Sequence, residues 1–327
     1  MKGKKYIYAH KFEGLPKLTD LELVEEELPP LKDGDVLVKV QCLSLDPYMR
    51  PYAVENLKEG DVMMNFFVAG HVIDSKHESF SNGTLVCGPF GWTTHAVIQG
   101  KNLTKMDYLQ DLSASAGLGA AGMPGLTAYF GVLNVLEPKE GETLYVNSAA
   151  GAVGSIVGQI AKIKGCRVIG SAGSDEKVAF LKSLGFDEAF NYKTVTSVED
   201  ELKKLCPDGI DMFFENVGGP EFSKVIKLLR MDGRAAVCGA ISQYNSTEPV
   251  FIEEFMMPLI KNRIKIQGLH VHKYFEEWPS GRIELVKWIK EGKIKIKEHV
   301  TKGFENLPKA FIELFTGGNF GKAVVMV

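Results

Sequence analysis

The chain has 327 residues and a formal net charge of -3, with 38 basic and 41 acidic side chains in no long run of one sign. Hydrophobic residues make up 45% and charged residues 24% of the chain, as in ordinary folded proteins. These values exclude a protein that binds polyanions through its overall positive charge, so no nucleic-acid partner is expected. The length predicts about two domains, with a core large enough to need no covalent crosslinks.

Glycine and cysteine usage narrow the class further. Glycine is over-represented, with 34 residues or about a tenth of the chain against a usual ~7%. The five cysteines are odd in number and include no C-x-x-C pair, which predicts free thiols in a reducing cytoplasm. Residues 1–10 lack the apolar core of a secretory signal. Residues 112–136 carry no charge but contain five glycines and a proline, which favours a buried crossover between domains over a membrane span.

The first 110 residues have a sequence pattern that is typical of antiparallel β structure. Residues 36–40 and 84–87 are short apolar runs, and each follows a turn that contains Asp-Gly or Asn-Gly. Alternating strand-like runs with such turns are typical of antiparallel sheets. No long helical period occurs in this part of the sequence.

After residue 120 the pattern changes to strands that alternate with helices. Strands are predicted at 143–147, 167–170, 210–214 and 235–238, and helices at 153–164 and 176–184. This alternation predicts βαβ units and a parallel sheet. A helix is predicted at 307–315 and a strand at 322–327, and the texture of that last strand predicts that the chain returns to its first domain.

A glycine-rich turn lies between the strand at 143–147 and the helix that follows. It reads Ala149-x-Gly151-x-x-Gly154, a dinucleotide fingerprint with alanine in the first position. Gly151 would let the backbone approach a pyrophosphate, and Gly154 would allow the helix to pack closely on the strand. The N–H groups and dipole of the helix N-terminus would then face the phosphates. We therefore expect a dinucleotide cofactor.

The end of the next strand indicates which dinucleotide. Residues 171–174 read Ser-Ala-Gly-Ser, without the acid that usually holds the ribose 2′-hydroxyl of NAD. Lys177 follows in the first turn of the next helix and could supply charge for a 2′-phosphate. Asp175 and Glu176 are interpreted as helix-start acids, although they leave NADH open. The pattern favours NADP(H).

Metal and nucleophile chemistry have weaker signals. His71 could suggest zinc, but Cys42 and Asp46 make a poor ligand set, so His71 is interpreted as a turn or packing residue and no metal is expected. No G-x-S-x-G elbow is present. His270 and His272 alternate as on one strand and are expected to line a surface or pocket.

One tyrosine lies where an enzyme that reduces carbonyl-conjugated double bonds needs a hydrogen-bond donor. Tyr244 comes just after the predicted strand 235–238, at the sheet edge where α/β proteins bind ligands. A hydroxyl there could stabilise the enolate oxygen that develops when a conjugated double bond is reduced. A packing role for this loop residue remains open from the sequence pattern alone.

Eight motifs in order resemble one family over nearly the whole chain. They cover residues 46–50 (DPYMR), 122–130 (GMPGLTAYF), 149–154 (AAGAVG), 173–177 (GSDEK), 190–193 (FNYK), 216–219 (NVGG), 238–245 (CGAISQYN) and 319–322 (NFGK). Together they are similar to the prostaglandin reductase branch of the zinc-independent medium-chain dehydrogenases/reductases.

The resemblance implies an α/β protein with a GroES-like β-rich domain and a Rossmann domain with a doubly wound parallel sheet. The expected boundaries are 1–120 for the first domain, 121–295 for the NADP(H)-binding domain and 296–327 for the return to the first. The implied activity is NADPH-dependent reduction of the C=C bond of 15-oxo-prostaglandins and other α,β-unsaturated ketones and aldehydes. Oxidation of the leukotriene B4 12-hydroxyl is the second implied reaction, and a cytoplasmic homodimer is the implied assembly.

The resemblance also implies site residues, with Tyr244 facing the substrate carbonyl as the catalytic residue. The implied cofactor-binding residues are Ala152, Val153, Gly154, Ser155, Lys177, Tyr192, Asn216, Cys238, Gly239, Ala240, Ile241, Ser242, Gln243, Tyr244, Leu269, His270, Val271 and Asn319. The sequence departs from the family pattern at residues 66–71 and 269–274, which are expected to border the substrate cleft. Two alternatives stay open: a general quinone or alkenal reductase, and a non-catalytic NADPH-binding protein.

Overall fold

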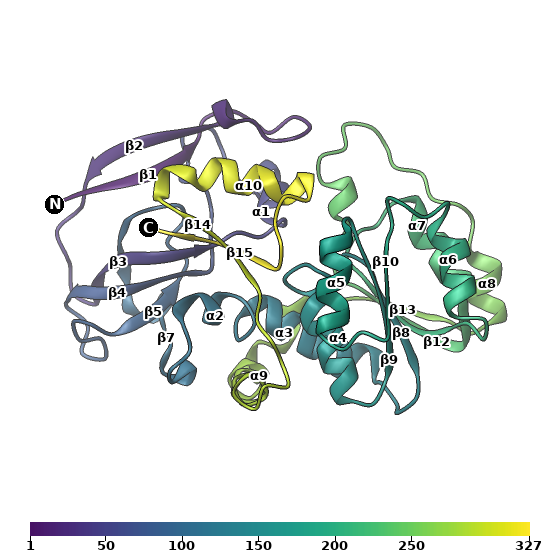
Figure 1. Cartoon of the computed structure of the whole chain (residues 1–327). Coiled ribbons are helices and arrows are strands. Elements are labelled where there is room, and N and C mark those ends of the chain that lie inside the picture. Colours follow the sequence, from purple (N-terminus) through teal and green to yellow (C-terminus); the bar gives the residue numbers. More distant parts are fainter. The chain divides into compact units, whose positions relative to one another are not determined.

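The computed structural model describes residues 1–327 and divides the chain into two units (Figure 1). The first unit comprises Met1–Gly122 and Glu298–Val327, and the second comprises Met123–Lys297. The C-terminal segment thus belongs to the same unit as the N-terminus. The predicted boundaries after residues 120 and 295 lie two residues before those of the units.

The first unit is β-rich. A seven-stranded sheet has the order β14-β15-β3-β4-β5-β7, with β6 also paired to β3, and β1 and β2 form a separate antiparallel pair. All these pairs are antiparallel except β14 with β15. The prediction of antiparallel β structure in the first part of the chain is confirmed. The strands are β1 (Lys2–Tyr8), β2 (Leu21–Glu27), β3 (Asp35–Ser44), β4 (Val68–Ser75), β5 (Leu85–Gly88), β6 (His95–Gln99), β7 (Thr104–Lys105), β14 (Glu298–Lys302) and β15 (Lys322–Met326), and the helices are α1 (Met49–Asn56), α2 (Ala114–Leu118) and α10 (Leu307–Thr316).

A buried ion pair joins the two distant segments of this unit. The ammonium of Lys322, on β15, lies 2.7 Å from a carboxylate oxygen of Asp46 and 2.8 Å from the carbonyl oxygen of Leu45. Both charged side chains are almost fully buried, and breaking such a pair would leave an uncompensated charge in the core. Two of the family motifs, which begin at Asp46 and end at Lys322, therefore contribute to the folding of this unit.

The second unit contains the predicted parallel sheet. Its six strands have the order β10-β9-β8-β11-β12-β13, and every neighbouring pair is parallel. Numbered within the unit, this is the order 3-2-1-4-5-6 of a dinucleotide-binding fold, and the predicted Rossmann fold is confirmed. The strands are β8 (Thr143–Val146), β9 (Arg167–Ala172), β10 (Glu188–Asn191), β11 (Ile210–Glu215), β12 (Leu229–Val237) and β13 (Lys265–Gly268).

Helices cover both faces of the parallel sheet. Figure 1 shows α4 and α5 on one face and α6, α7 and α8 on the other. The strands are therefore apolar along most of their length, as in β11, where five of six residues are buried. The helices of this unit are α3 (Met123–Phe130), α4 (Gly154–Ile163), α5 (Asp175–Ser183), α6 (Val198–Leu205), α7 (Pro220–Ile226), α8 (Met256–Lys261) and α9 (Trp278–Lys290).

The uncharged stretch 112–136 consists of α2, α3 and a π-helical turn at Gly131–Leu136, and most of its residues are buried. The division between the two units falls inside it, after Gly122. None of the helices in residues 1–327 has the length and apolar character that a membrane crossing requires.

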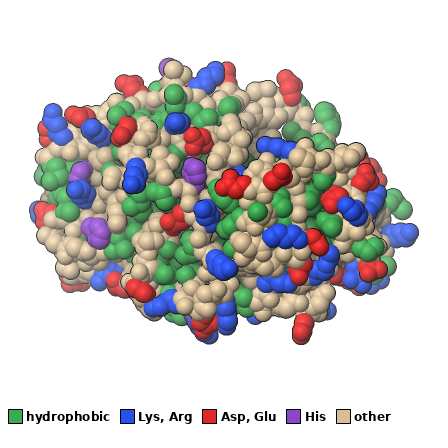
Figure 2. All heavy atoms as spheres, in the orientation of Figure 1, with side chains coloured by type: hydrophobic (Ala, Val, Ile, Leu, Met, Phe, Trp, Pro, Cys, Tyr) green, Lys and Arg blue, Asp and Glu red, His purple; other side chains and the backbone are tan.

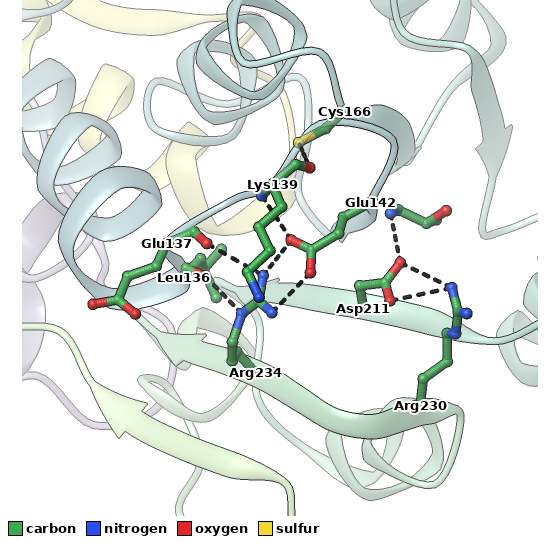
Figure 3. A network of polar contacts seen from close by, with 9 residues as sticks. Leu136, Glu137, Lys139, Glu142, Cys166, Asp211, Arg230 and Arg234 are labelled. Carbon is green, nitrogen blue, oxygen red and sulfur yellow. Dashed lines mark hydrogen bonds and ion pairs between the residues drawn. The ribbon is translucent and has the colours of Figure 1, made fainter.

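A polar network holds the amino ends of the strands in the second unit (Figure 3). Arg234, on β12, donates to both carboxylate oxygens of Glu142 at 3.0 and 2.5 Å, and its Nε donates to the carbonyl oxygen of Leu136 at 2.6 Å. Asp211, on β11, accepts from the backbone N–H of Thr143 at 2.8 Å. These contacts crosslink β8, β11 and β12 at the amino ends of the strands. In this fold ligands bind at the opposite edge of the sheet, at the carboxyl ends of the strands.

Candidate dinucleotide site

The fingerprint turn follows β8 directly and is tightly packed. Ser148 has a positive φ of 48°, which reverses the chain between the strand and α4. A Cβ atom on Gly154 would lie 2.6 Å from the carbonyl oxygen of Ser148 and 2.8 Å from Cα of Ala149. A Cβ atom on Gly151 would lie 3.2 Å from the same oxygen. Gly154 is therefore required for close packing of helix on turn, whereas Gly151 is less constrained by the protein itself.

The start of α4 offers unpaired donors to a phosphate. The backbone N–H groups of Ala152, Val153 and Gly154 make no backbone hydrogen bond within the second unit. Ser155 is buried, and both its N–H and its hydroxyl donate to the carbonyl oxygen of Gly151, at 3.2 and 2.8 Å. The free donors thus belong to the three residues before Ser155, where the helix dipole is positive. These residues fit a dinucleotide pyrophosphate.

Alanine substitutions at the two glycines of the turn are expected to differ in their effects on stability and on NADPH binding. Gly154→Ala should lower the free energy of unfolding by about 1–3 kcal/mol, because the added methyl overlaps backbone atoms that cannot move freely. Gly151→Ala should cost less than about 1 kcal/mol of stability but should weaken NADPH binding, because its methyl occupies the approach to the pyrophosphate. Denaturant unfolding and NADPH titration of both variants check this, and equal stability losses would contradict it.

The carboxyl ends of β9 and β10 form a basic cluster. The strands are parallel and Asn191 pairs with Ala172, so the residues that follow each strand come together. A Cβ atom on Gly173 would lie 3.0 Å from the hydroxyl of Tyr192 and 3.3 Å from Cε of Lys193. Burial, and then the charge of Lys193, lower the pKa of Lys177. Two cations near one point are suited to a 2′-phosphate. Lys193 was not among the predicted site residues.

The two acids at the start of α5 lie where helix-start acids are expected. Ser174 caps the helix, accepting from the N–H of Lys177 at 3.3 Å, and Asp175 and Glu176 lie in the first turn. The carboxylate of Asp175 accepts from the side-chain amide of Asn191 at 2.8 Å. This bond directs Asp175 toward β10.

The point at which the strand order reverses lies between β8 and β11. Here Asn216 donates its backbone N–H to the side-chain oxygen of Asn147 at 2.7 Å, and its side-chain amide to the carbonyl oxygen of Asn147 at 3.0 Å. In open α/β sheets this reversal creates the crevice in which the dinucleotide lies. Asn147 was missed by sequence reasoning, although it lies directly between the end of β8 and the fingerprint.

The predicted segment 238–244 folds against the turn that follows β11. The N–H groups of Ile241 and Ser242 donate to the carbonyl oxygens of Asn216 and Val217, at 3.3 and 3.0 Å. The hydroxyl of Tyr244 accepts from the N–H of Ala240 at 3.3 Å. Burial raises the pKa of Tyr244 above its usual value. The phenol therefore keeps its proton at neutral pH and can donate it in a hydrogen bond.

The other residues of segment 238–244 carry no charge. Burial raises the pKa of the Cys238 thiol to about 12, so the thiol is neutral and a poor nucleophile. Residues Gly239, Ala240 and Gln243 complete the loop, and Ile241–Gln243 forms one 3-10 turn. The loop thus presents mainly backbone groups and the tyrosine.

Residues 269–271 follow β13, and the expectation of a strand through the two histidines is wrong. β13 ends at Gly268, and Val271–Glu277 forms a 3-10 helix. The rings of His270 and His272 have centroids 5.0 Å apart; burial, and then His270, lower the pKa of His272. Leu269 donates its N–H to the carbonyl oxygen of Val237 at 2.8 Å. The strand ends because β12 ends beside it.

The second unit therefore brings together the predicted cofactor residues that it contains, at the carboxyl ends of its strands. Asn319 belongs to the first unit, between α10 and β15, where its side-chain amide donates to the carbonyl oxygen of Gly321 at 3.3 Å. Its role toward the cofactor stays a prediction.

Comparisons with known proteins agree along the chain. One family model, described as zinc-binding dehydrogenase, matches residues 152–288, and another, described as N-terminal domain of oxidoreductase, matches residues 4–106. Prostaglandin reductase 1 of Bos taurus is 51% identical and covers 99% of this chain and 98% of that protein. The NADP(+)-dependent 2-alkenal reductase of Nicotiana tabacum is 41% identical, covering 99% and 97%. The crystal structure of CurA from Vibrio vulnificus in complex with NADPH has a TM-score of 0.92 at 39% identity, covering 99% of both chains.

The zinc in the first family description does not fit the side chains of this protein. No three His, Cys, Asp or Glu side chains in residues 1–327 lie close enough together to hold a metal ion. His71 lies exposed on β4, with its Nδ1 3.2 Å from the carbonyl oxygen of Gly83. No catalytic step is therefore assigned to a metal.

The similarity extends over both units, because the match to prostaglandin reductase 1 covers 99% of this chain. A relative that is 51% identical over nearly the full length of both proteins establishes common descent at the level of a family. The chain therefore belongs to the prostaglandin reductase family of the medium-chain dehydrogenases/reductases.

Proposed function

We propose that this protein uses NADPH to reduce the C=C bond of α,β-unsaturated ketones and aldehydes. The observation that carries the proposal is the neutral, hydrogen-bonding hydroxyl of Tyr244, held on a loop at the carboxyl edge of the nucleotide-binding sheet. The names of three relatives support it: prostaglandin reductase 1, NADP(+)-dependent 2-alkenal reductase and the NADPH-dependent curcumin reductase of Escherichia coli, which is 40% identical. The predicted oxidoreductase class and NADP(H) cofactor are confirmed by these relatives and by the NADPH complex of CurA.

Each part of the site has a role in this reaction. NADPH, when bound, supplies the hydride that the β-carbon of the substrate receives. The free N–H groups at the start of α4 hold the pyrophosphate, and the basic cluster of Lys177, Tyr192 and Lys193 holds the 2′-phosphate. Tyr244 donates a hydrogen bond to the carbonyl oxygen as negative charge develops on it. A proton from solvent completes the α-carbon.

The finer substrate assignment is also a proposal. We expect 15-oxo-prostaglandins and simple 2-alkenals as substrates, with oxidation of the leukotriene B4 12-hydroxyl as a second reaction. Residues 66–71 and 269–274, which depart from the family pattern, are proposed to set the preference. A general quinone or alkenal reductase is the nearest alternative, and a non-catalytic NADPH-binding protein is the alternative of another class.

Substrate comparison tests the proposal. Loss of the NADPH absorbance should occur with a 15-oxo-prostaglandin and with a simple 2-alkenal, and should not occur with the corresponding saturated ketone. Activity with a quinone alone would support the general quinone reductase. NADPH binding without consumption for any of these substrates would support the non-catalytic alternative.

For the assembly, we propose a cytoplasmic homodimer with no nucleic-acid partner. On the face drawn in Figure 2, Lys and Arg lie among Asp and Glu with no broad field of one sign. β13 is one of the two edge strands of its sheet, and α8, which precedes it, exposes Met256, Met257 and Ile260, each by more than half. An open strand edge with exposed apolar side chains favours association of two copies. Light scattering on a sizing column would show twice the chain mass.

A further inference from the structure

Glu215 is a buried carboxyl at the reversal point of the sheet that has no assigned role in the proposed function. It is the last residue of β11 and only 1% exposed. Its Oε1 accepts from the side-chain amide of Asn147 at 2.7 Å, from the N–H of Gly218 at 2.8 Å and from the N–H of Val217. Its Oε2 is buried without any hydrogen-bond partner. One carboxyl oxygen therefore organises three donors around it.

The groups that Glu215 holds are connected to the predicted cofactor residues. Asn147, fixed by the carboxyl, in turn accepts the backbone N–H of Asn216. The turn that follows contains Gly218 with a φ of +71°, and the carboxyl bonds two of its N–H groups. Without that acceptor the turn would contain two partly buried N–H groups without a partner, next to a residue in the left-handed conformation.

The same residue also fixes the loop that contains Tyr244. Its backbone carbonyl accepts from the N–H groups of Cys238 and Gly239, at 2.8 and 3.2 Å. The 216–217 turn, which the carboxyl holds, accepts from the loop through the carbonyl oxygens of Asn216 and Val217. The geometry of 238–244 thus depends on the turn that Glu215 organises.

A buried carboxyl of this kind has an unfavourable effect on the free energy of folding. Burial of a carboxylate with one oxygen unpaired destabilises the fold, and burial is the main cause that raises the pKa of Glu215. An apolar side chain would fill the position at lower cost, but it would leave the amide of Asn147 and two backbone N–H groups without an acceptor. The carboxyl is therefore best explained by the arrangement that it maintains.

We propose that Glu215 is a positioning residue for the nicotinamide half of the cofactor, acting through Asn147 and the 216–218 turn. The proposal deepens the proposed function, because it takes NADPH as the ligand. A dinucleotide-binding sheet consists of two mononucleotide halves, with the adenosine side on β8–β10 and the second nucleotide on β11–β13. Glu215 and the loops that it holds belong to the second half, whereas Lys177 and Tyr192 belong to the first.

Two ligands separate the halves experimentally. Adenosine 2′,5′-bisphosphate carries the 2′-phosphate end alone, and NADPH spans both halves. Glu215→Ala should raise the Kd of NADPH by about 10- to 100-fold, the range expected when buried donors lose their acceptor. Its Kd for adenosine 2′,5′-bisphosphate should stay within about twofold of the original protein. Glu215→Gln, which keeps an oxygen acceptor but no charge, should restore most of the NADPH affinity.

Further variants make the outcomes decisive. Asn147→Ala removes the link to Asn216 and one donor to Glu215 but leaves the Glu215 carboxyl in place, and it should reproduce the selective loss, also if Glu215→Ala does not fold. Glu142→Gln changes the carboxylate of the polar network at the opposite ends of the same strands (Figure 3) and should change neither Kd. Equal weakening of both ligands, or an unchanged NADPH Kd in Asn147→Ala, would overturn the positioning role. If the original protein binds no NADPH, the proposed function fails instead.

Discussion

Replacing Tyr244 by phenylalanine is expected to lower kcat for enone reduction about 100-fold, the usual effect of removing one donor to a developing oxyanion. The Kd of NADPH should change less than about twofold, because the loop is held mainly by backbone bonds from Ile241 and Ser242. A phenol is protonated at neutral pH, and burial raises the pKa of Tyr244 further, so its hydrogen is available to the substrate oxygen. Single-turnover rates with a 2-alkenal, together with NADPH titration, measure the two quantities separately.

Tyr192→Phe is the matched control for this prediction. Tyr192 is also a predicted cofactor-binding residue, but it follows β10, beside Gly173 at the proposed adenosine end. Losing its hydroxyl should raise the KM for NADPH and leave kcat within about twofold of the original value. An unchanged kcat in Tyr244→Phe would remove Tyr244 from the mechanism, and equal kcat losses in both variants would show an indirect effect.

Replacing Lys177 by alanine is expected to raise the KM for NADPH about 30-fold and the KM for NADH less than about twofold. The magnitude is that of a charge-assisted hydrogen bond to a phosphate, and only NADPH carries the 2′-phosphate. Lys193→Ala should act in the same direction with a smaller effect, because its ammonium belongs to the same cluster. Initial rates with both cofactors give the ratio of KM values.

Lys182 provides the control on the same helix. Its ammonium already donates to the carbonyl oxygen of Asp187 and to Glu188, at 2.6 and 2.7 Å, away from the carboxyl end of β9. Lys182→Ala should leave the preference for NADPH over NADH unchanged. Parallel increases in both KM values for Lys177→Ala would show that the 2′-phosphate binds elsewhere.

The features that sequence reasoning found are those encoded in short contiguous segments. The alternation of apolar strands with helices predicted the parallel sheet, because buried strands and amphipathic helices each have a local signature. The fingerprint at 149–154 is one strand–turn–helix unit, and Lys177 lies in the first turn of the helix that follows the next strand. These signals need no knowledge of which strands are neighbours.

The residues that were missed depend on strand order and on burial. Lys193 becomes a partner of Lys177 because β10 lies beside β9. Asn147 and Glu215 meet because β8 lies beside β11, although the residues are 68 positions apart in the chain. The expected strand through His270 and His272 was wrong because alternation over three residues is too short to distinguish a strand from a tight helix. Pairings between distant strands cannot be deduced from one sequence.

Isotope transfer tests the central claim most directly. The protein is incubated with a 2-alkenal or 15-oxo-prostaglandin and NADPH that carries deuterium at C4, with each C4 face labelled in a separate sample. We expect one of the two labelled cofactors to deliver deuterium to the β-carbon of the saturated product, with the carbonyl group intact. Deuterium on the carbonyl carbon of an allylic alcohol, or oxidation of NADPH without label in the substrate, would contradict it.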